Sequence, residues 1–98
     1  MKLSKNLIRF ESLYQEGSSH FSEIYHEDIK IGWLEEREQG FLQDMETLYC
    51  RRFENEDLKQ IPKGLKTKSY KSECVGYTEV CFYELNDLLR VIEIIGLD

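Results

Sequence analysis

The sequence WLEEREQGFLQDMETLYCRRF, residues 33–53, carries the periodic pattern that decides the predicted fold. Seven of its apolar side chains fall within an arc of about 140° when successive residues are placed 100° apart, as on an α-helix. They are Leu34, Phe41, Leu42, Met45, Leu48, Tyr49 and Phe53. The spacing predicts an amphipathic helix with its acidic side chains at or beyond the edge of the apolar face. Gly40 costs such a helix about 1 kcal/mol relative to alanine, so a break at Gly40 is the alternative.

Helical spacing also extends towards the N-terminus. Apolar residues recur at intervals of three and four over residues 3–14, and Gly17 ends that pattern. Residues 21–28 also fit a helical face, although residues 29–33 alternate between apolar and polar as a strand would. We therefore predict helices over 3–14 and to about residue 28.

The pattern changes after residue 62. Residues 65–72 and 77–84 are rich in Thr, Tyr, Val, Cys and Phe and flank Gly76, which predicts a β-hairpin. A short capped turn is predicted before it, over 56–61. Residues 86–96 fit either a helix, with Asn86 as its N-cap and a Gly96–Leu97 ending, or a further strand, and we favour the helix.

The predicted fold class is therefore α+β. A chain of 98 residues forms one domain, here 1–98, with room for a single core. It would consist of N-terminal helices followed by a β-hairpin and a C-terminal helix. A three-stranded antiparallel meander at the C-terminus is the alternative.

Composition and charge narrow the class of protein. The chain is 41% hydrophobic, and no apolar run approaches the roughly 20 residues that cross a bilayer, which predicts a soluble protein without membrane association. Three cysteines without a C-x-x-C pair are typical of buried thiols in a reducing compartment, so we predict a cytoplasmic location. The net charge of −6 arises entirely before residue 58, where thirteen acidic residues face seven basic ones.

No pattern in the chain indicates catalysis. His20, Glu23 and Glu27 would share one helix face, but His26 would point elsewhere, so two histidines could not bind one metal ion. The sequence contains no phosphate-binding glycine loop, dinucleotide fingerprint or zinc-protease motif. We predict a protein that is not an enzyme and has no cofactor or metal.

The acidic segment around residues 33–57 suggests protein binding instead. Carboxylates held outward on a stiff element can occupy a basic groove of another macromolecule and attract it at low salt. The predicted protein-binding residues are Trp33, Glu35, Glu36, Asp44, Glu46, Glu54, Glu56 and Asp57. The predicted function is an inhibitor of the immunity-protein, antitoxin or phage and plasmid anti-defence type, acting on a nuclease or a nucleic-acid-handling complex. Apolar residues outside the helical stripes, such as Ile8, and Cys50 on the polar side, suggest a homodimer as well.

Residues 59–71 support an alternative function. This stretch holds five lysines and no acidic residue, and Lys66, Lys68 and Tyr70 would share one face of a strand. Lysines beside an aromatic ring suit phosphate attraction and base stacking. Helices followed by a basic hairpin loosely resemble the winged-helix architecture, which implies a nucleic-acid-binding regulator.

Overall fold

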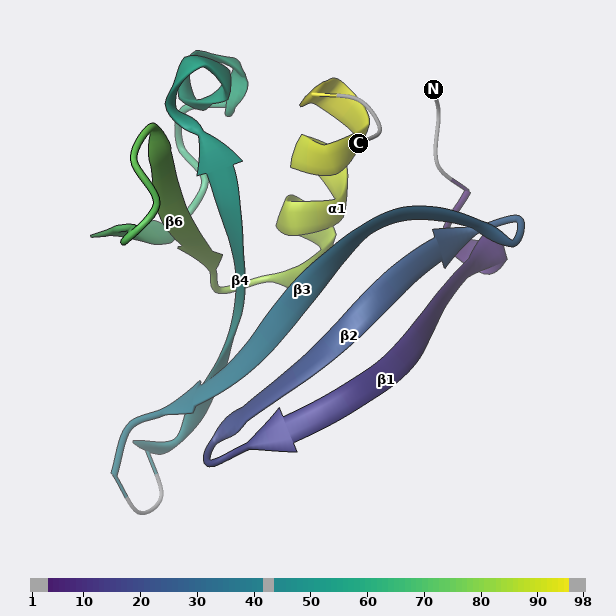
Figure 1. The fold of residues 1–98 in the computed structure, drawn as a ribbon, viewed down its shortest axis with the longest axis horizontal. Helices are drawn as coiled ribbons and strands as arrows, with labels where there is room; N and C mark the ends of the chain where they lie inside the picture. Colours follow the sequence, from purple (N-terminus) through teal and green to yellow (C-terminus); the bar gives the residue numbers. More distant parts are fainter. Residues whose placement is uncertain (1–3, 42–43, 96–98) are drawn as a thin grey trace.

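The computed structural model describes residues 4–41 and 44–95 and shows a six-stranded antiparallel sheet with one α-helix (Figure 1). In chain order the elements are η1 (Lys5–Leu7), β1 (Ile8–Glu16), β2 (Ser19–His26), β3 (Ile29–Gln39), β4 (Glu46–Glu54), η3 (Asn55–Gln60), β5 (Thr67–Lys71), β6 (Tyr77–Phe82) and α1 (Leu85–Ile95), where η denotes a short 3-10 helix. The strand order across the sheet is β1-β2-β3-β4-β6-β5.

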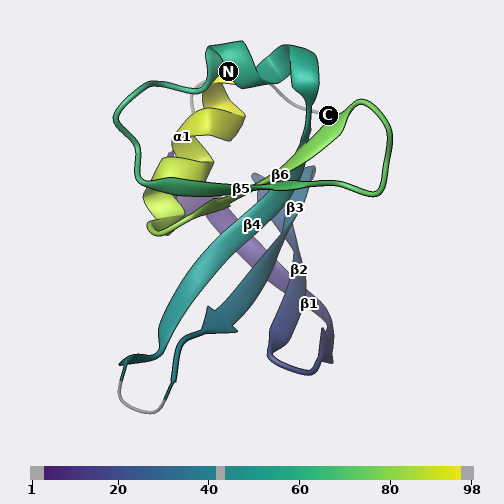
Figure 2. The ribbon, with the colours of Figure 1, turned by 90° about the vertical axis from the view of Figure 1, so that its left-hand side faces the viewer.

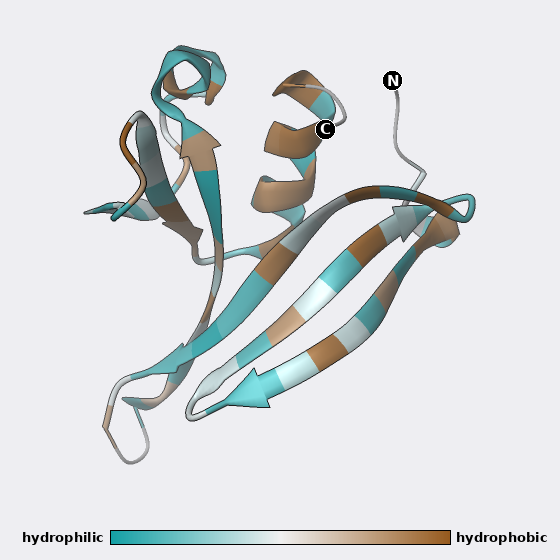
Figure 3. Cartoon of the chain, in the orientation of Figure 1, coloured by the Kyte–Doolittle hydropathy of each residue, from teal (hydrophilic) through white to brown (hydrophobic). Residues whose placement is uncertain are grey.

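A single hydrophobic core joins α1 to one face of the sheet. Leu88, Val91 and Ile92 of α1 are buried against sheet residues that include Ile24 and Phe82. Most of α1 has the colour of hydrophobic residues in Figure 3. The opposite face, which we call the open face, carries a second, smaller cluster built on β4 and β6. The described residues place no helix over the open face.

The sheet divides between β3 and β4. These strands pair only from Glu35–Cys50 to Gln39–Glu46. Beyond that point residues 29–34 pair with β2, while residues 51–54 pair with β6. Figures 1 and 2 show the two halves parting, with α1 lying between them on the core side. The result is a wedge between β3 and β4, open at the end where β4 leads into η3.

The predicted N-terminal helices are wrong, because residues 8–26 form β1 and β2. In β2, Ser22, Ile24 and His26 are buried in alternation, which is the period of a strand and not of a helix. The turn after β2 holds Glu27 and Asp28 at φ values of 52° and 66°. Two successive left-handed residues are typical of the tight hairpin turn whose twist matches the flanking strands.

The predicted helix over 33–53 is also wrong, and the break at Gly40 is correct. Gly40 has a φ of 116°, and a Cβ there would collide with the backbone carbonyl of Asp44. The chain reverses at this point, and both flanking segments are strands. Leu34, Tyr49 and Phe53 pack in the α1 core, whereas Leu48 is buried in the open-face cluster. Side chains that would share one helical stripe therefore lie on opposite faces of the sheet.

The C-terminal third follows the sequence pattern more closely. β5 and β6 form a hairpin around Gly76, η3 lies where the short turn is predicted, and α1 is a helix, which excludes the meander. Leu3, Leu42 and the Gly96–Leu97 ending lie outside the described residues. The fold class as predicted is nevertheless contradicted, since strands dominate the chain.

The cysteine prediction needs correction as well. Cys50 and Cys81 are cross-strand neighbours on β4 and β6 and form a disulfide, while Cys74 is an exposed thiol. The pairing removes the main support for a cytoplasmic location, because disulfides persist mainly in oxidising compartments. Ile8 packs against the core and Cys50 is buried, so neither residue supports a homodimer any longer.

Reduction of the Cys50–Cys81 disulfide is expected to lower the free energy of unfolding. The bond joins residues 31 apart in sequence, and closing a loop of that size restricts the unfolded chain by roughly 3–4 kcal/mol. Urea unfolding with and without reductant measures the change. Cys74→Ser should shift the free energy by less than about 0.5 kcal/mol. An unfolding midpoint that is the same with and without reductant would contradict the prediction.

Candidate functional site

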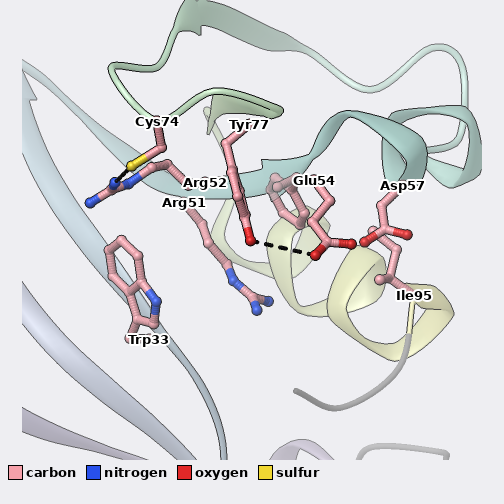
Figure 4. A pocket seen from close by; sticks show the side chains of 9 residues that line it. Trp33, Arg51, Arg52, Glu54, Asp57, Cys74, Tyr77 and Ile95 are labelled. Carbon is pink, nitrogen blue, oxygen red and sulfur yellow. Dashed lines mark hydrogen bonds between the residues drawn. The ribbon is translucent and has the colours of Figure 1, made fainter.

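A cavity of about 460 Å³ lies at the mouth of the wedge (Figure 4). Its lining comes from β3, β4, the end of α1, η3 and the β5–β6 turn, which are far apart in sequence. The volume is within the range of small-molecule sites, and pockets of this kind combine apolar walls with a few polar groups. We call it the wedge cavity.

Arg51 is the buried polar group of this cavity. Its side chain points from β4 towards the α1 face of the sheet, and the residue is only 7% exposed. The guanidinium lies over Gly32, where a Cβ would sit 3.5 Å from Arg51 Cζ, and its Cζ is 5.3 Å from the Phe53 ring centroid. Burial lowers the pKa of Arg51, and the charge of Asp57 opposes that effect.

Arg52 and Trp33 form the adjacent wall on the open-face side. Arg52 Cζ lies 5.9 Å from the centroid of the Trp33 ring, a cation–π distance. Arg52 Nη1 also donates a hydrogen bond to Cys74 Sγ at 2.9 Å. The exposed guanidinium is thus held at the cavity mouth beside the indole.

The far side of the cavity is acidic. Glu54 and Asp57 line it together with Tyr77, whose hydroxyl donates a hydrogen bond to Glu54 Oε1 at 3.4 Å. Figure 4 shows the two arginines on the Trp33 side and the two carboxylates beyond Tyr77. The cavity therefore has a cationic, aromatic half and an acidic half.

The structure divides the predicted protein-binding residues into separate groups. Trp33, Glu54 and Asp57 line the wedge cavity, and Glu56 lies beside it at the start of η3. Asp44 and Glu46 lie at the other end of β4, and Glu36 of β3 pairs with Tyr49 of β4. Since a strand rises about 3.3 Å per residue, Glu46 and Glu54 are roughly 26 Å apart.

Glu35 is not available to a partner. It is 9% exposed, and Arg37 holds it with two hydrogen bonds of 2.8 and 3.0 Å, while Ser19 Oγ donates a third at 2.6 Å. Arg37 also forms a 2.9 Å ion pair with Glu79 of β6. The internal network explains why this carboxylate points inward.

Five carboxylates gather near the β3–β4 turn, on a surface that we call the acidic hairpin end. They are Glu36, Glu38, Asp44, Glu46 and Glu84. Burial raises the pKa of Tyr49, and the charges of Glu36, Glu84 and Glu38 raise it further, which places these three around one ring. Among the described residues, none of the five forms an ion pair.

The predicted lysine face is present on the open face of β5. Lys66 Nζ and Lys68 Nζ lie 4.3 and 5.8 Å from the centroid of the Tyr83 ring. Lys68 and Tyr70 are two residues apart on β5, so their side chains lie on the same face, as predicted. β5 is also an edge strand, where lysines discourage pairing with another chain.

The histidines lie apart. His20 Nε2 is 2.6 Å from Ser12 Oγ, whereas His26 Nε2 accepts a hydrogen bond from the Ser4 backbone N–H. Glu23 pairs with Lys30. Within residues 4–41 and 44–95, no group of three or more His, Cys, Asp or Glu side chains could hold a metal ion. No helix in that part of the chain is long and apolar enough to span a bilayer.

Sequence reasoning missed Arg51, Arg52 and Tyr77 as site residues. The two adjacent arginines are a signal in the sequence, but successive side chains of a strand point to opposite faces of the sheet. Only the structure shows that both side chains border one cavity. Gly32 gives room for Arg51, and no local pattern links two residues so far apart in sequence.

No protein-family model matches this sequence, and comparisons with curated proteins and with solved structures yield no significant match. Its function must therefore be inferred from its own residues.

We expect the Glu35 carboxylate to make the free energy of unfolding depend on pH. Burial alone would raise its pKa, but hydrogen bonds from Arg37 and Ser19 outweigh burial, and the pKa falls below its ordinary value of 4.5. Such a carboxylate stabilises the fold above pH 4.5, and this contribution disappears as the pH falls through the folded pKa. Glu35→Gln should therefore cost roughly 1–3 kcal/mol at neutral pH.

Urea unfolding as a function of pH tests this. The difference between wild type and Glu35→Gln should shrink below about pH 4.5. Glu16→Gln, an exposed carboxylate on β1, serves as the control and should follow the wild type. A constant Glu35→Gln difference across the pH range would contradict the assignment.

Proposed function

We propose that this protein is a small acidic binding protein that inhibits a partner protein by docking its acidic hairpin end on a basic surface of that partner. The observation that carries the proposal is the set of five carboxylates without an ion pair among the described residues, at an end of the sheet where two apolar side chains are exposed. Phe41 is 77% exposed and Met45 is 50% exposed.

Exposed apolar residues near acidic side chains fit the usual anatomy of a binding surface. Apolar anchors supply burial at the centre of an interface, and a charged rim selects the partner and speeds association. The acidic side chains favour a partner rich in Lys and Arg. A groove that normally holds nucleic-acid phosphates has that chemistry, which supports an immunity protein, an antitoxin or a phage or plasmid inhibitor of a nuclease.

Charge reversal at the acidic hairpin end is expected to abolish partner binding. The test variant is Glu36→Lys/Glu38→Lys/Glu84→Lys, used as bait for affinity purification from the host or its competitor. Mass spectrometry should identify a basic protein captured by the wild type, and calorimetry with that purified protein should show at least tenfold weaker binding by the variant. Phe41→Ala should weaken binding too, without lowering the melting temperature.

The matched control carries the same change of charge at exposed carboxylates elsewhere. Glu16→Lys/Glu27→Lys/Glu73→Lys should retain binding. Equal loss in both triple variants would reduce the effect to net charge and contradict the proposal. Loss in Glu54→Lys/Glu56→Lys alone would assign the interface to the η3 end instead.

The lysine face provides a second candidate function, binding of single-stranded nucleic acid. The observation that favours it is the alignment of Lys66 and Lys68 over Tyr83, with exposed Tyr70 on the same face. Such a face can attract phosphates and stack a base. The net charge of −6 opposes it at long range.

Fluorescence anisotropy with a labelled single-stranded oligonucleotide tests the second candidate. Lys66→Ala/Lys68→Ala/Lys71→Ala should weaken binding about tenfold or more, and added salt should weaken the wild type. Arg9→Ala/Lys30→Ala/Arg90→Ala removes equal charge elsewhere and should bind as the wild type does. Absence of binding at low salt, or equal effects of both variants, would exclude this candidate.

A further inference from the structure

A groove of about 310 Å³ lies on the open face of the sheet, and we call it the aromatic groove. Its lining comes from β1, β2, β3 and β4. Tyr14 pairs with Phe21 across β1 and β2, and Phe21 pairs with Glu35 of β3. Glu35 in turn pairs with Cys50 of the open-face cluster, so these side chains share that face. The residues that line the groove include Leu13, Tyr14, Phe21, Lys30, Trp33 and Arg52.

Aromatic side chains dominate this lining and are already held in place. The Tyr14 and Phe21 rings stack with 4.6 Å between their centroids and 20° between their planes. Arg52 Cζ lies 5.9 Å from the centroid of the Trp33 ring. Because these contacts restrict the rings before binding, little side-chain entropy is lost when a ligand packs against them. Leu13 and Tyr14 are each 52% exposed, so apolar surface remains uncovered in the groove.

A ligand in this position meets side chains, because the hydrogen bonds between strands lie within the plane of the sheet. A peptide in the polyproline II conformation suits such a surface. It has three residues per turn and no internal hydrogen bonds, and its backbone stays solvated. Its proline rings pack in grooves lined by aromatic residues, and the cost of ordering it is small because its conformation is preformed.

The charges of the groove indicate which residues accompany the prolines. Lys30 forms an ion pair with Glu23, so these two charges offset each other. Within residues 4–41 and 44–95, Arg52 forms no ion pair, and its side-chain hydrogen bond goes to the thiol of Cys74. The groove therefore has one cation at its border that an acidic side chain of the ligand can pair with.

We propose that the aromatic groove docks an acidic, proline-containing segment of another protein in the polyproline II conformation. The proline rings lie against Tyr14, Phe21 and Trp33, and an acidic side chain lies at Arg52. This inference goes beyond the inhibitor function and does not depend on it, since no side chain of the acidic hairpin end lines the groove in the part of the chain that the structure describes.

Trp33 is the single tryptophan of the chain, so intrinsic fluorescence reports on the groove. The probe is an acetylated and amidated peptide with one aspartate between two runs of four prolines. One control peptide replaces the prolines by alternating glycine and serine, and a second replaces the aspartate by lysine. The probe should shift Trp33 emission saturably. The glycine–serine peptide should bind at least tenfold more weakly, because it is not preorganised, and the lysine peptide about threefold more weakly.

Two variants of β1 provide the matched comparison. Tyr14→Ala should weaken binding of the probe about tenfold or more, because an exposed aromatic anchor is lost. Phe10→Ala removes another exposed ring from the same strand, but Phe10 pairs with Ile24 of the α1 core and so lies on the other face of the sheet. This control should bind as the wild type does.

Two arginine variants test the charge. Arg52→Gln should weaken the aspartate probe about threefold and leave the lysine peptide no weaker than before. Arg90→Gln removes the same charge from an exposed position on α1 and should change neither affinity. Thermal melting confirms that each variant is folded, and the exposed Arg52 keeps the test valid if Tyr14→Ala does not fold.

Several results would overturn the inference. These are no saturable change with the probe at millimolar concentration, equal binding of the glycine–serine peptide or of benzyl alcohol, and equal loss in Tyr14→Ala and Phe10→Ala. Sedimentation that shows a dimer dissociated by Tyr14→Ala would assign the groove to a second copy of the chain instead. The triple variant of the acidic hairpin end should bind the probe normally, so failure of one proposal does not imply failure of the other.

Discussion

The architecture depends on one short ladder, the five residue pairs that join β3 to β4. A sheet of six strands has to bury its apolar face, and the described residues offer a single α-helix, of eleven residues, to cover it. If β3 and β4 paired along their whole length, α1 would cover only part of a broad face. Because the two halves of the sheet part, both can pack against the helix. One small core then buries apolar side chains from both halves.

Side chains on the open face reinforce the part of the sheet where β3 and β4 remain paired. Cys50 and Cys81 link β4 to β6, and Arg37 on β3 reaches Glu79 on β6 while also binding Glu35. Opposite charges that are largely removed from water stabilise only when their geometry is good, and here one guanidinium serves two carboxylates. These contacts hold together the part of the sheet from which its two halves diverge.

The two ends of β4 consequently have different chemistry. Near the β3–β4 turn the strands are fully paired, and their carboxylates stand outward around Tyr49. At the other end the wedge exposes side-chain positions from both faces of β4 to one cavity, which Arg51 and Arg52 both line. One strand thus connects an acidic surface with a cavity that has a cationic, aromatic half and an acidic half.

The sequence alone determined the C-terminal hairpin, the short helical turn and α1, because strand-forming residues, Gly76 and a helical stripe are local signals. It also offered a break at Gly40 as the alternative to a continuous helix. The strands over 8–54 were decided only by tertiary structure. Both faces of the sheet bury apolar side chains there. The apolar residues from Leu34 to Phe53 that mimic one face of a helix therefore pack in two different clusters, one on each face of the sheet. The wedge cavity is likewise a tertiary property, since it depends on where two strands stop pairing, and hydrogen bonding between distant segments leaves no periodic trace in either one.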